Sequence, residues 1–371
     1  MAKLYSKRKI LKITALLVTA IILITYITTG QVSPLAALQN RTLLTQLISD
    51  TVPVFYDYNH INVAMLEKTF LGFNINSPMS IIESNVFAFA FLEIPEEEIE
   101  EEEPEVDLSD AKPIKETTIS NKNSNGYYEA EGVLVKNATT YDFDPNALIN
   151  EDLKFDCSDD GPHILVIHSH SSESYTATDK NYYLPTDPDR TEDINYNVVR
   201  VGKEIVNTLK VNGIEAVHDT SLHDYPSYNG SYKSSLASVE EYLKKYPSIK
   251  IVLDIHRDAM VQADGTKLKL VADVENKKAA QIMLLTGSNQ GGLDHPDWRE
   301  NLKFAMKLQR VVNKMYPGLA RPVSFTKERY NTHTTYGSII IEVGTTGNTL
   351  EEALVSAQMI GNAVASFITD N

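Results

Sequence analysis

Two chemically distinct halves make up Ile164-Leu-Val-Ile-His-Ser-His-Ser-Ser-Glu-Ser-Tyr175. The first four residues are apolar and come shortly after a Gly-Pro pair, which predicts a short strand buried on both faces. Two histidines and a glutamate follow that strand directly. In α/β proteins functional groups gather at the carboxyl ends of the strands. This strand end is therefore the first candidate for a functional site.

Strands and helices alternate after this segment. The spacing of apolar residues predicts helices over 197–212, 235–246, 298–315 and 349–368, and strands over 215–217, 249–255, 280–285 and 339–343. Sustained alternation of this kind predicts one α/β domain with a mostly parallel sheet covered by helices on both faces.

The histidines after the first strand are candidate zinc ligands. Zinc binds imidazole nitrogens and carboxylates, and a catalytic zinc has three protein ligands. His168 and His170 share a face if the strand continues, whereas a turn after His168 aims His170 and Glu173 into the crevice. We predict His170 and Glu173 as ligands and keep His168 as an alternative.

A further candidate ligand lies in Ile251-Val-Leu-Asp-Ile-His-Arg-Asp258. Strand alternation puts Asp254 and His256 on one face and three aliphatic residues on the other. His256 is therefore a predicted ligand that has a supporting carboxylate beside it. Polar residues near this strand and before the last one are candidates for binding substrate, namely Arg257, Arg329 and Asn331.

Glu342 is a lone carboxyl group inside the last apolar strand. Burial raises the pKa of a carboxyl group towards the range that suits general acid–base catalysis. We predict Glu342 as the catalytic base. Glu192 and Asp193, which come just before the helix that begins at Asn197, are alternatives for the third ligand, although acids at a helix start also have a purely structural use.

Charge and cysteine content exclude several classes of function. Lys and Arg number 34 against 50 Asp and Glu, which gives a net charge of −16 and argues against a nucleic-acid partner. Cys157 is the only cysteine, which excludes a disulfide framework and a Cys-rich metal site. A metal would have to sit on His and carboxylate side chains.

A nearly charge-free apolar segment follows a basic N-terminus. At about 1.5 Å per residue, Ile10 to Thr29 is long enough to cross a bilayer core of about 30 Å. The basic residues before it place the N-terminus in the cytoplasm. Cleavage near Leu35-Ala-Ala37 is the alternative, but the apolar run exceeds that of an ordinary signal peptide. We predict an uncleaved anchor with the remaining chain outside the cytoplasm.

The chain between the anchor and the α/β domain has two parts. In residues 31–92 the apolar residues follow neither a helical nor a strand period, and we predict a membrane-proximal module or a spacer. Dense like charge between Glu93 and Asp110 prevents a folded core, and a Ser/Asn/Lys-rich stretch continues it. The predicted organisation is a basic tail (1–9), an anchor (10–29), a membrane-proximal region (30–92), a linker (93–126) and the α/β domain (127–371).

Seven ordered blocks resemble the stage II sporulation protein P family, which comprises membrane-anchored peptidoglycan hydrolases of endospore-forming bacteria. The blocks are His168-Ser-His-Ser-Ser-Glu-Ser-Tyr175, Asn197-Val-Val-Arg-Val-Gly202, His223-Asp-Tyr-Pro-Ser-Tyr228, Asp254-Ile-His-Arg-Asp258, His295-Pro-Asp-Trp-Arg-Glu-Asn-Leu302, Tyr316-Pro-Gly-Leu-Ala-Arg321, and Ile341-Glu-Val-Gly344 with Asn348.

The resemblance implies a zinc-dependent N-acetylmuramoyl-L-alanine amidase with an additional endopeptidase activity on peptide cross-links, acting in sporulation and engulfment. The wider zinc amidase family uses two His and one Glu as ligands and a late Glu as base, an element that the block around Glu342 fits. Implied partners are peptidoglycan, a lytic transglycosylase similar to stage II sporulation protein D, and a membrane scaffold. The alternative is a non-catalytic domain of the same fold that binds peptidoglycan or a partner.

Overall fold

The computed structural model describes residues 108–120, 126–177 and 179–370. The predicted tail, anchor and membrane-proximal region, and most of the predicted linker, lie outside these residues. Within the described ranges, no helix combines the length and the apolar character that crossing a bilayer requires.

The described residues form an eight-stranded sheet that is mostly parallel. Its strand order is β2-β3-β11-β10-β12-β7-β4-β6, and the β2–β3 and β10–β12 pairs are antiparallel while the other pairs are parallel. The strands are β2 (Tyr128–Ala130), β3 (Val133–Asn137), β4 (Ile164–Ile167), β6 (Ala216–His218), β7 (Ile251–Asp258), β10 (Ile282–Thr286), β11 (Val323–Phe325) and β12 (Gly337–Thr345). This arrangement confirms the predicted α/β class.

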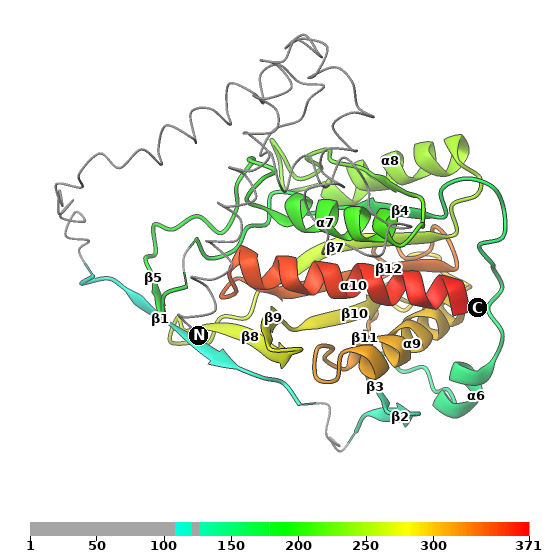
Figure 1. Ribbon diagram of the computed structural model, residues 1–371, viewed down its shortest axis with the longest axis horizontal. Coiled ribbons are helices and arrows are strands. Elements are labelled where there is room, and N and C mark those ends of the chain that lie inside the picture. The colour runs from blue at the N-terminus through cyan, green and yellow to red at the C-terminus, as the bar shows by residue number, and fades with distance from the viewer. Residues whose placement is uncertain (1–107, 121–125, 178, 371) are drawn as a thin grey trace, which may run out of the picture. The chain divides into compact units, whose positions relative to one another are not determined.

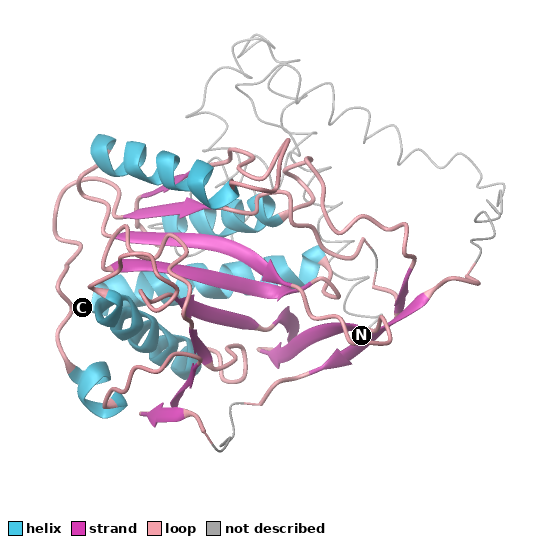
Figure 2. Ribbon diagram, turned by 180° about the vertical axis from the view of Figure 1, so that it is seen from behind, coloured by secondary structure: helices cyan, strands magenta, loops and turns pink. Residues whose placement is uncertain are grey.

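Helices cover the two faces of this sheet unequally. The helices are α6 (Pro145–Asn150), α7 (Val198–Val211), α8 (Ser231–Lys245), α9 (Trp298–Met315) and α10 (Leu350–Asp370). On one face α10 lies between α7 and α9 and contacts both (Figure 1). On the opposite face α8 packs against β4 (Figure 2).

Alternation along the central strands explains these layers. In β4, Ile164 and Val166 join the main core under α7 and α10, whereas Leu165 and Ile167 join a smaller core with Val239 of α8. The apolar strand is therefore buried on both faces, as its composition predicts.

A second, four-stranded sheet has the order β5-β1-β8-β9. Its strands are β1 (Lys112–Thr117), β5 (Tyr182–Tyr183), β8 (Lys267–Val274) and β9 (Lys277–Ala280). Strand β1 pairs in parallel with β8 over four residues. Because β1 lies within 93–126, the prediction that this whole stretch is a linker is wrong. The buried Ile114 anchors the strand, and the polar residues around it conceal this from the sequence pattern.

Candidate active site

The chain turns directly after β4, which separates the two histidines of the first motif. His168 is fully buried, with its Nδ1 3.1 Å from the carbonyl oxygen of Ile255 and its Nε2 2.9 Å from Nε2 of His218. Burial lowers the pKa of His168 to about 3. Gly202 of α7 leaves room for this ring, since a Cβ there would lie 2.5 Å from it. His168 therefore fills the core, and only His170 faces the candidate site.

His170 lies between aromatic rings and the start of α8. Its ring stacks on Tyr228 at 4.5 Å and stands nearly perpendicular to the ring of His256, with 5.2 Å between the centroids. The hydroxyl groups of Tyr228 and Ser231 lie 3.1 Å from Nε2 and 3.2 Å from Nδ1. Burial and the neighbouring His256 lower the pKa of His170, which favours the neutral imidazole that a metal requires.

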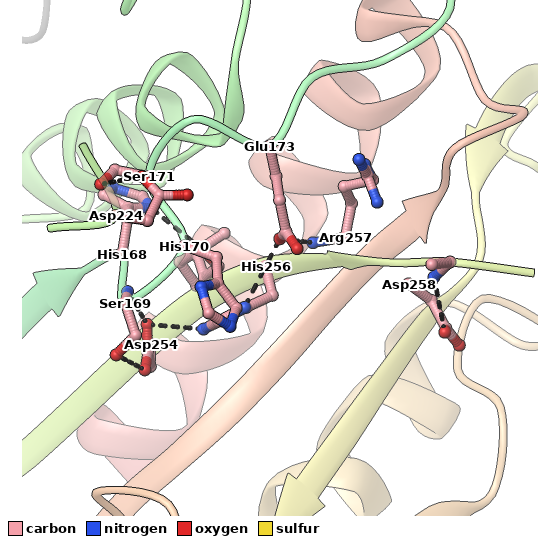
Figure 3. Close-up of polar contacts among 12 residues, drawn as sticks. His168, Ser169, His170, Ser171, Glu173, Asp224, Asp254, His256, Arg257 and Asp258 are labelled. Atoms are coloured by element: carbon pink, nitrogen blue, oxygen red, sulfur yellow. Dashed lines mark hydrogen bonds and ion pairs between the residues drawn. The ribbon is translucent and has the colours of Figure 1, made fainter. Parts of the chain in front are cut away.

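His256 of β7 lies between the carboxylates of Asp254 and Glu173. It is on the face of the strand opposite Ile251, Leu253 and Ile255, as alternation predicts. Its Nε2 is 3.0 Å from Oδ1 of Asp254 and its Nδ1 is 3.5 Å from Oε2 of Glu173 (Figure 3). The Asp254 contact has ion-pair distance but lies off the hydrogen-bond direction, so Nε2 makes no hydrogen bond. Burial alone would lower the pKa of His256, but the two carboxylates outweigh it and raise the pKa well above its usual value.

A chain of hydrogen bonds fixes Asp254. Its carboxylate accepts from the backbone N–H of Ser169 at 2.8 Å and from the Ser169 hydroxyl at 2.6 Å. That hydroxyl also contacts Ser235 of α8 at 2.6 Å, and Asn331 donates its amide to the Ser235 hydroxyl at 2.9 Å. Burial opposes ionisation, but His256 and Ser169 lower the pKa of Asp254 to about 2. Asn331 thus supports the orientation of His256 through two serines and a carboxylate.

Glu173 is buried and held by two arginines. Its Oε2 accepts the backbone N–H of Arg257 at 3.1 Å, and its Oε1 lies 3.5 Å from Arg190. The Arg257 guanidinium donates to the carbonyl oxygens of Ser174 and Asp189, at 2.8 and 2.7 Å. Arg257, a predicted substrate-binding residue, therefore fixes the loop that carries Glu173. Although burial opposes it, His256 and Arg257 lower the pKa of Glu173, which keeps it ionised.

Glu342 of β12 lies beside His256 of β7, because the two residues pair in the parallel register. Its neighbours Ile341 and Val343 join the core on the far face, so Glu342 leaves the sheet on the side of His256. Its Oε2 is buried without a hydrogen-bond partner, and burial raises the pKa of Glu342 to about 8. This is the environment that the sequence predicts for the base.

The remaining predicted residues lie apart from this cluster. Glu192 and Asp193 are exposed, and the Asp193 carboxylate accepts the backbone N–H of Asn195 at 3.0 Å in a local turn. Arg329 donates to the carbonyl oxygen of Asp294 at 3.1 Å and lines a separate cavity. Glu192 and Asp193 are thus unsuited as ligands here, and Glu173 is the acid that reaches the histidines.

Sequence reasoning missed several residues around His170. Arg190 lies 4.8 Å above the Tyr228 ring and forms a 2.6 Å ion pair with Asp224. Tyr232 of α8 faces both His170 and His256, at 5.2 and 6.3 Å between ring centroids. Tyr228 and Asp224 belong to the block 223–228, which was a usable signal, whereas nothing in the local sequence marks Arg190 or Tyr232.

The side chains at this site have the chemistry of a zinc site. His170, Glu173 and His256 are donor types that zinc prefers, and Glu342 Oε2 beside them is buried without a hydrogen-bond partner. In the described part of the chain, no three His, Cys, Asp or Glu side chains stand close enough together to hold a metal ion as placed. The donor set fits zinc, while the imidazoles and carboxylates contact one another directly.

Comparison with known proteins decides the family. The sequence model described as Stage II sporulation protein P (SpoIIP) matches residues 62–365. The chain belongs to the stage II sporulation protein P family. The curated Stage II sporulation protein P of Bacillus subtilis (strain 168) is 29% identical over 219 residues, which is 56% of this chain and 50% of that protein. The chain thus aligns with half the length of this family member.

Three solved amidase structures are similar to this chain of the stage II sporulation protein P family. The N-acetylmuramoyl-L-alanine amidase AmiC2 of Nostoc punctiforme is 14% identical with a TM-score of 0.32, and covers 57% of this chain and 97% of its own. An N-acetylmuramoyl-L-alanine amidase from Clostridium difficile 630 is 13% identical with a TM-score of 0.34, and the match covers 56% of this chain and 96% of that chain. The amidase Ami1 from Mycobacterium smegmatis is 10% identical with a TM-score of 0.32, and the match covers 57% of this chain and 98% of that chain.

Proposed function

We propose that this protein is a zinc-dependent N-acetylmuramoyl-L-alanine amidase that hydrolyses peptidoglycan during sporulation and engulfment. The single observation that carries the proposal is the convergence of His170, Glu173 and His256 beside Glu342, whose Oε2 has no hydrogen-bond partner. Family membership supports the same assignment.

The ligands of the zinc ion would be His170, Glu173 and His256. Zinc bound there would supply a Lewis acid that polarises a water molecule and the carbonyl group of the scissile amide. Asp254 orients His256 from behind, and Arg257 holds Glu173 through its backbone N–H. His256 and Glu173 thus each have a protein group that fixes their orientation, as metal sites require.

Glu342 would move the proton in this reaction. Water adds to the carbonyl carbon of the lactyl group, the bond to the nitrogen of L-alanine breaks, and the proton of the water passes through Glu342 to the leaving amine. A carboxyl group whose pKa is raised to about 8 can accept and return a proton near neutral pH. His170 and Tyr232 border the same space and would exclude bulk water.

The finer assignments of the proposal rest on the family. We include a second, endopeptidase activity on peptide cross-links, and anchoring of the protein by residues 10–29 with the catalytic domain outside the cytoplasm. The proposed partners are a lytic transglycosylase similar to stage II sporulation protein D and a membrane scaffold. An anchor would keep the hydrolase against its sheet-like substrate.

The test is release of muropeptides from purified peptidoglycan, with metal analysis of the same protein. An amidase exposes the amino group of L-alanine, so labelling of new amino termini should give alanine. A chelator should abolish release, and added zinc should restore it. Release that exposes only another amine would support an endopeptidase alone. Zinc-free protein that binds peptidoglycan without cleaving it would support the non-catalytic alternative instead.

A further inference from the structure

A large cavity lies at the other end of the sheet from the candidate active site. It has a volume of about 740 Å³ and is lined by residues that precede three parallel strands, namely 154–156, Ser158 and Asp159 before β4, Ile249 and Lys250 before β7, and Tyr336 before β12. Glu342 is six residues beyond Tyr336 along β12, which corresponds to about 20 Å. The cavity is therefore separate from the catalytic cluster, and its volume is typical of a ligand site.

The motif around His295 builds one wall of this cavity. Asn301 of α9 is almost fully buried and donates its amide to the carbonyl oxygens of Thr332, Thr335 and Ser338, at 2.7 to 2.9 Å. These bonds fix the orientation of the amide, and its Oδ1 is left buried without a partner. An uncompensated buried acceptor is costly, so a donor from a ligand would be stabilised there.

Two histidines add further neutral groups to the wall. His295 contacts the Thr332 hydroxyl at 3.2 Å, and its ring lies 6.2 Å from that of His333, whose Nδ1 is buried without a partner. Burial lowers the pKa of both histidines to about 4, so each is a neutral imidazole with one donor and one acceptor at neutral pH.

The charges around the cavity nearly cancel. The charged residues among its lining are three cations, Lys154, Lys250 and Arg329, and four anions, Asp156, Asp159, Asp294 and Asp297. Lys250 is paired with Asp159 at 3.1 Å, and Lys154 with Glu300 at 3.2 Å. The electrostatic potential of the cavity therefore does not favour a strongly anionic or a strongly cationic ligand. A neutral ligand that carries hydroxyl and amide groups does find partners.

Tyr336 supplies an aromatic surface beside these polar groups. It is 36% exposed, and the ammonium group of Lys154 lies 5.7 Å from its ring centroid. Tyrosine combines an apolar ring face with a polar tip, which suits a ligand that has both an apolar face and hydroxyl groups. Sugar rings have both.

We propose that this cavity binds an N-acetylated glycan segment, as a second attachment point for the polymer that the active site cleaves. The identity of the polymer rests on the proposed function, whereas the match to a neutral saccharide rests on the cavity alone. Segment 329–336 connects the two sites, because Asn331 contacts Ser235 near Asp254 while Arg329 and His333 line the cavity.

Titration calorimetry of the full chain in detergent with the tetramer of N-acetylglucosamine tests the proposal. We expect saturable binding that Tyr336→Ala weakens at least tenfold. Tyr196→Ala is the matched control, since Tyr196 is 65% exposed but lines a different cavity. Equal binding by Tyr336→Ala and the wild type, loss of binding in Tyr196→Ala, or no binding at millimolar ligand would overturn the proposal. Tyr336-dependent binding of a free stem peptide in place of the saccharide would also overturn it.

Two further measurements separate this inference from the catalytic one. Glu342→Gln should bind the tetramer as the wild type does, so that an inactive enzyme still tests the cavity. On intact peptidoglycan, Tyr336→Ala should raise KM severalfold and leave kcat unchanged, with no change on a short muropeptide. A fall in kcat on both substrates would show a general structural defect and contradict the proposed role of Tyr336.

Discussion

Glu342 and His256 are register partners on adjacent parallel strands, β12 and β7, and leave the sheet on the same face. Neighbouring strands lie about 4.8 Å apart, so this pairing alone brings a carboxyl group next to an imidazole. His256 has carboxylate neighbours, whereas Oε2 of Glu342 has no hydrogen-bond partner. The two residues thus suit different tasks, His256 as a ligand and Glu342 as a base.

Glu342→Gln separates these tasks. The amide keeps the size of the side chain but cannot accept the proton, so muropeptide release should fall by about 10²–10⁴ while zinc content and folding are unchanged. Glu300→Gln, which alters another buried glutamate that is paired with Lys303, is the control and should retain activity. A Glu342→Gln protein that is zinc-free, or that cleaves at nearly the wild-type rate, would contradict the assignment.

His168 and His170 should respond differently to replacement by alanine. His170→Ala and His256→Ala remove proposed ligands and should abolish stoichiometric zinc binding in metal analysis. His168→Ala should keep its zinc and instead lower the free energy of unfolding, because it opens a cavity in the core. If zinc were lost only in His168→Ala, His168 would be the ligand and His170 the structural residue, which would contradict the assignment.

Gly202→Ala tests the close contact between α7 and His168. The added methyl group would lie 2.5 Å from the ring, and neither the helix nor the buried imidazole has free space beside it. We expect a loss of about 1–3 kcal/mol in urea unfolding. Lys203→Ala on the exposed side of the same helix should change stability by less than about 0.5 kcal/mol. Equal stabilities for the two variants would show that the His168 ring moves away from the added methyl group without destabilising the fold, which would contradict the prediction.

The buried His168 and its half-buried partner His218 should make the domain sensitive to mild acid. Burial lowers their pKa values to about 3 and about 4 in the folded state, against about 6.5 when unfolded. As the pH falls below about 6.5, the unfolded chain binds protons that the folded chain excludes, so stability decreases, by up to about 1.4 kcal/mol per pH unit and histidine. Urea unfolding between pH 7 and 5 measures this slope. His218→Gln should flatten it, and an unchanged slope would refute the explanation.

Protease protection of protoplasts tests the predicted anchor. If residues 10–29 span the membrane with the N-terminus inside, external protease should degrade the α/β domain in intact cells. A variant with two lysines placed at the centre of that apolar segment should lose membrane association, because charged side chains are costly in a bilayer core. Full protection of the domain in intact protoplasts would reverse the predicted orientation.

Local patterns predict the elements that depend on local chemistry. Helix α9 has the predicted bounds 298–315, since Pro296 precedes it and Pro317-Gly318 follows it. The paired faces of β7 follow from strict alternation, which places Asp254 beside His256. These features need no information from distant parts of the chain.

Strand β8 shows why other elements are missed. Its Lys267 and Lys269 are buried, which is unfavourable for a lysine until a carboxylate neutralises it. Asp189 and Asp179, which lie on either side of β5 and far away in sequence, do so at 2.6 and 2.5 Å. The same holds for Arg190 at the active site, whose partners Glu173 and Asp224 come from two different loops. Only the folded chain brings such charges together.

The hydrogen-bonded series from Asn331 through Ser235 and Ser169 to Asp254 makes the tilt of the His256 imidazole a property of a remote segment. Three of its links are uncharged side chains that a shift of less than an ångström would break or restore. Segment 329–336 therefore contacts the imidazole indirectly through this series, and a substitution there would tilt His256 without replacing any proposed ligand or the proposed base.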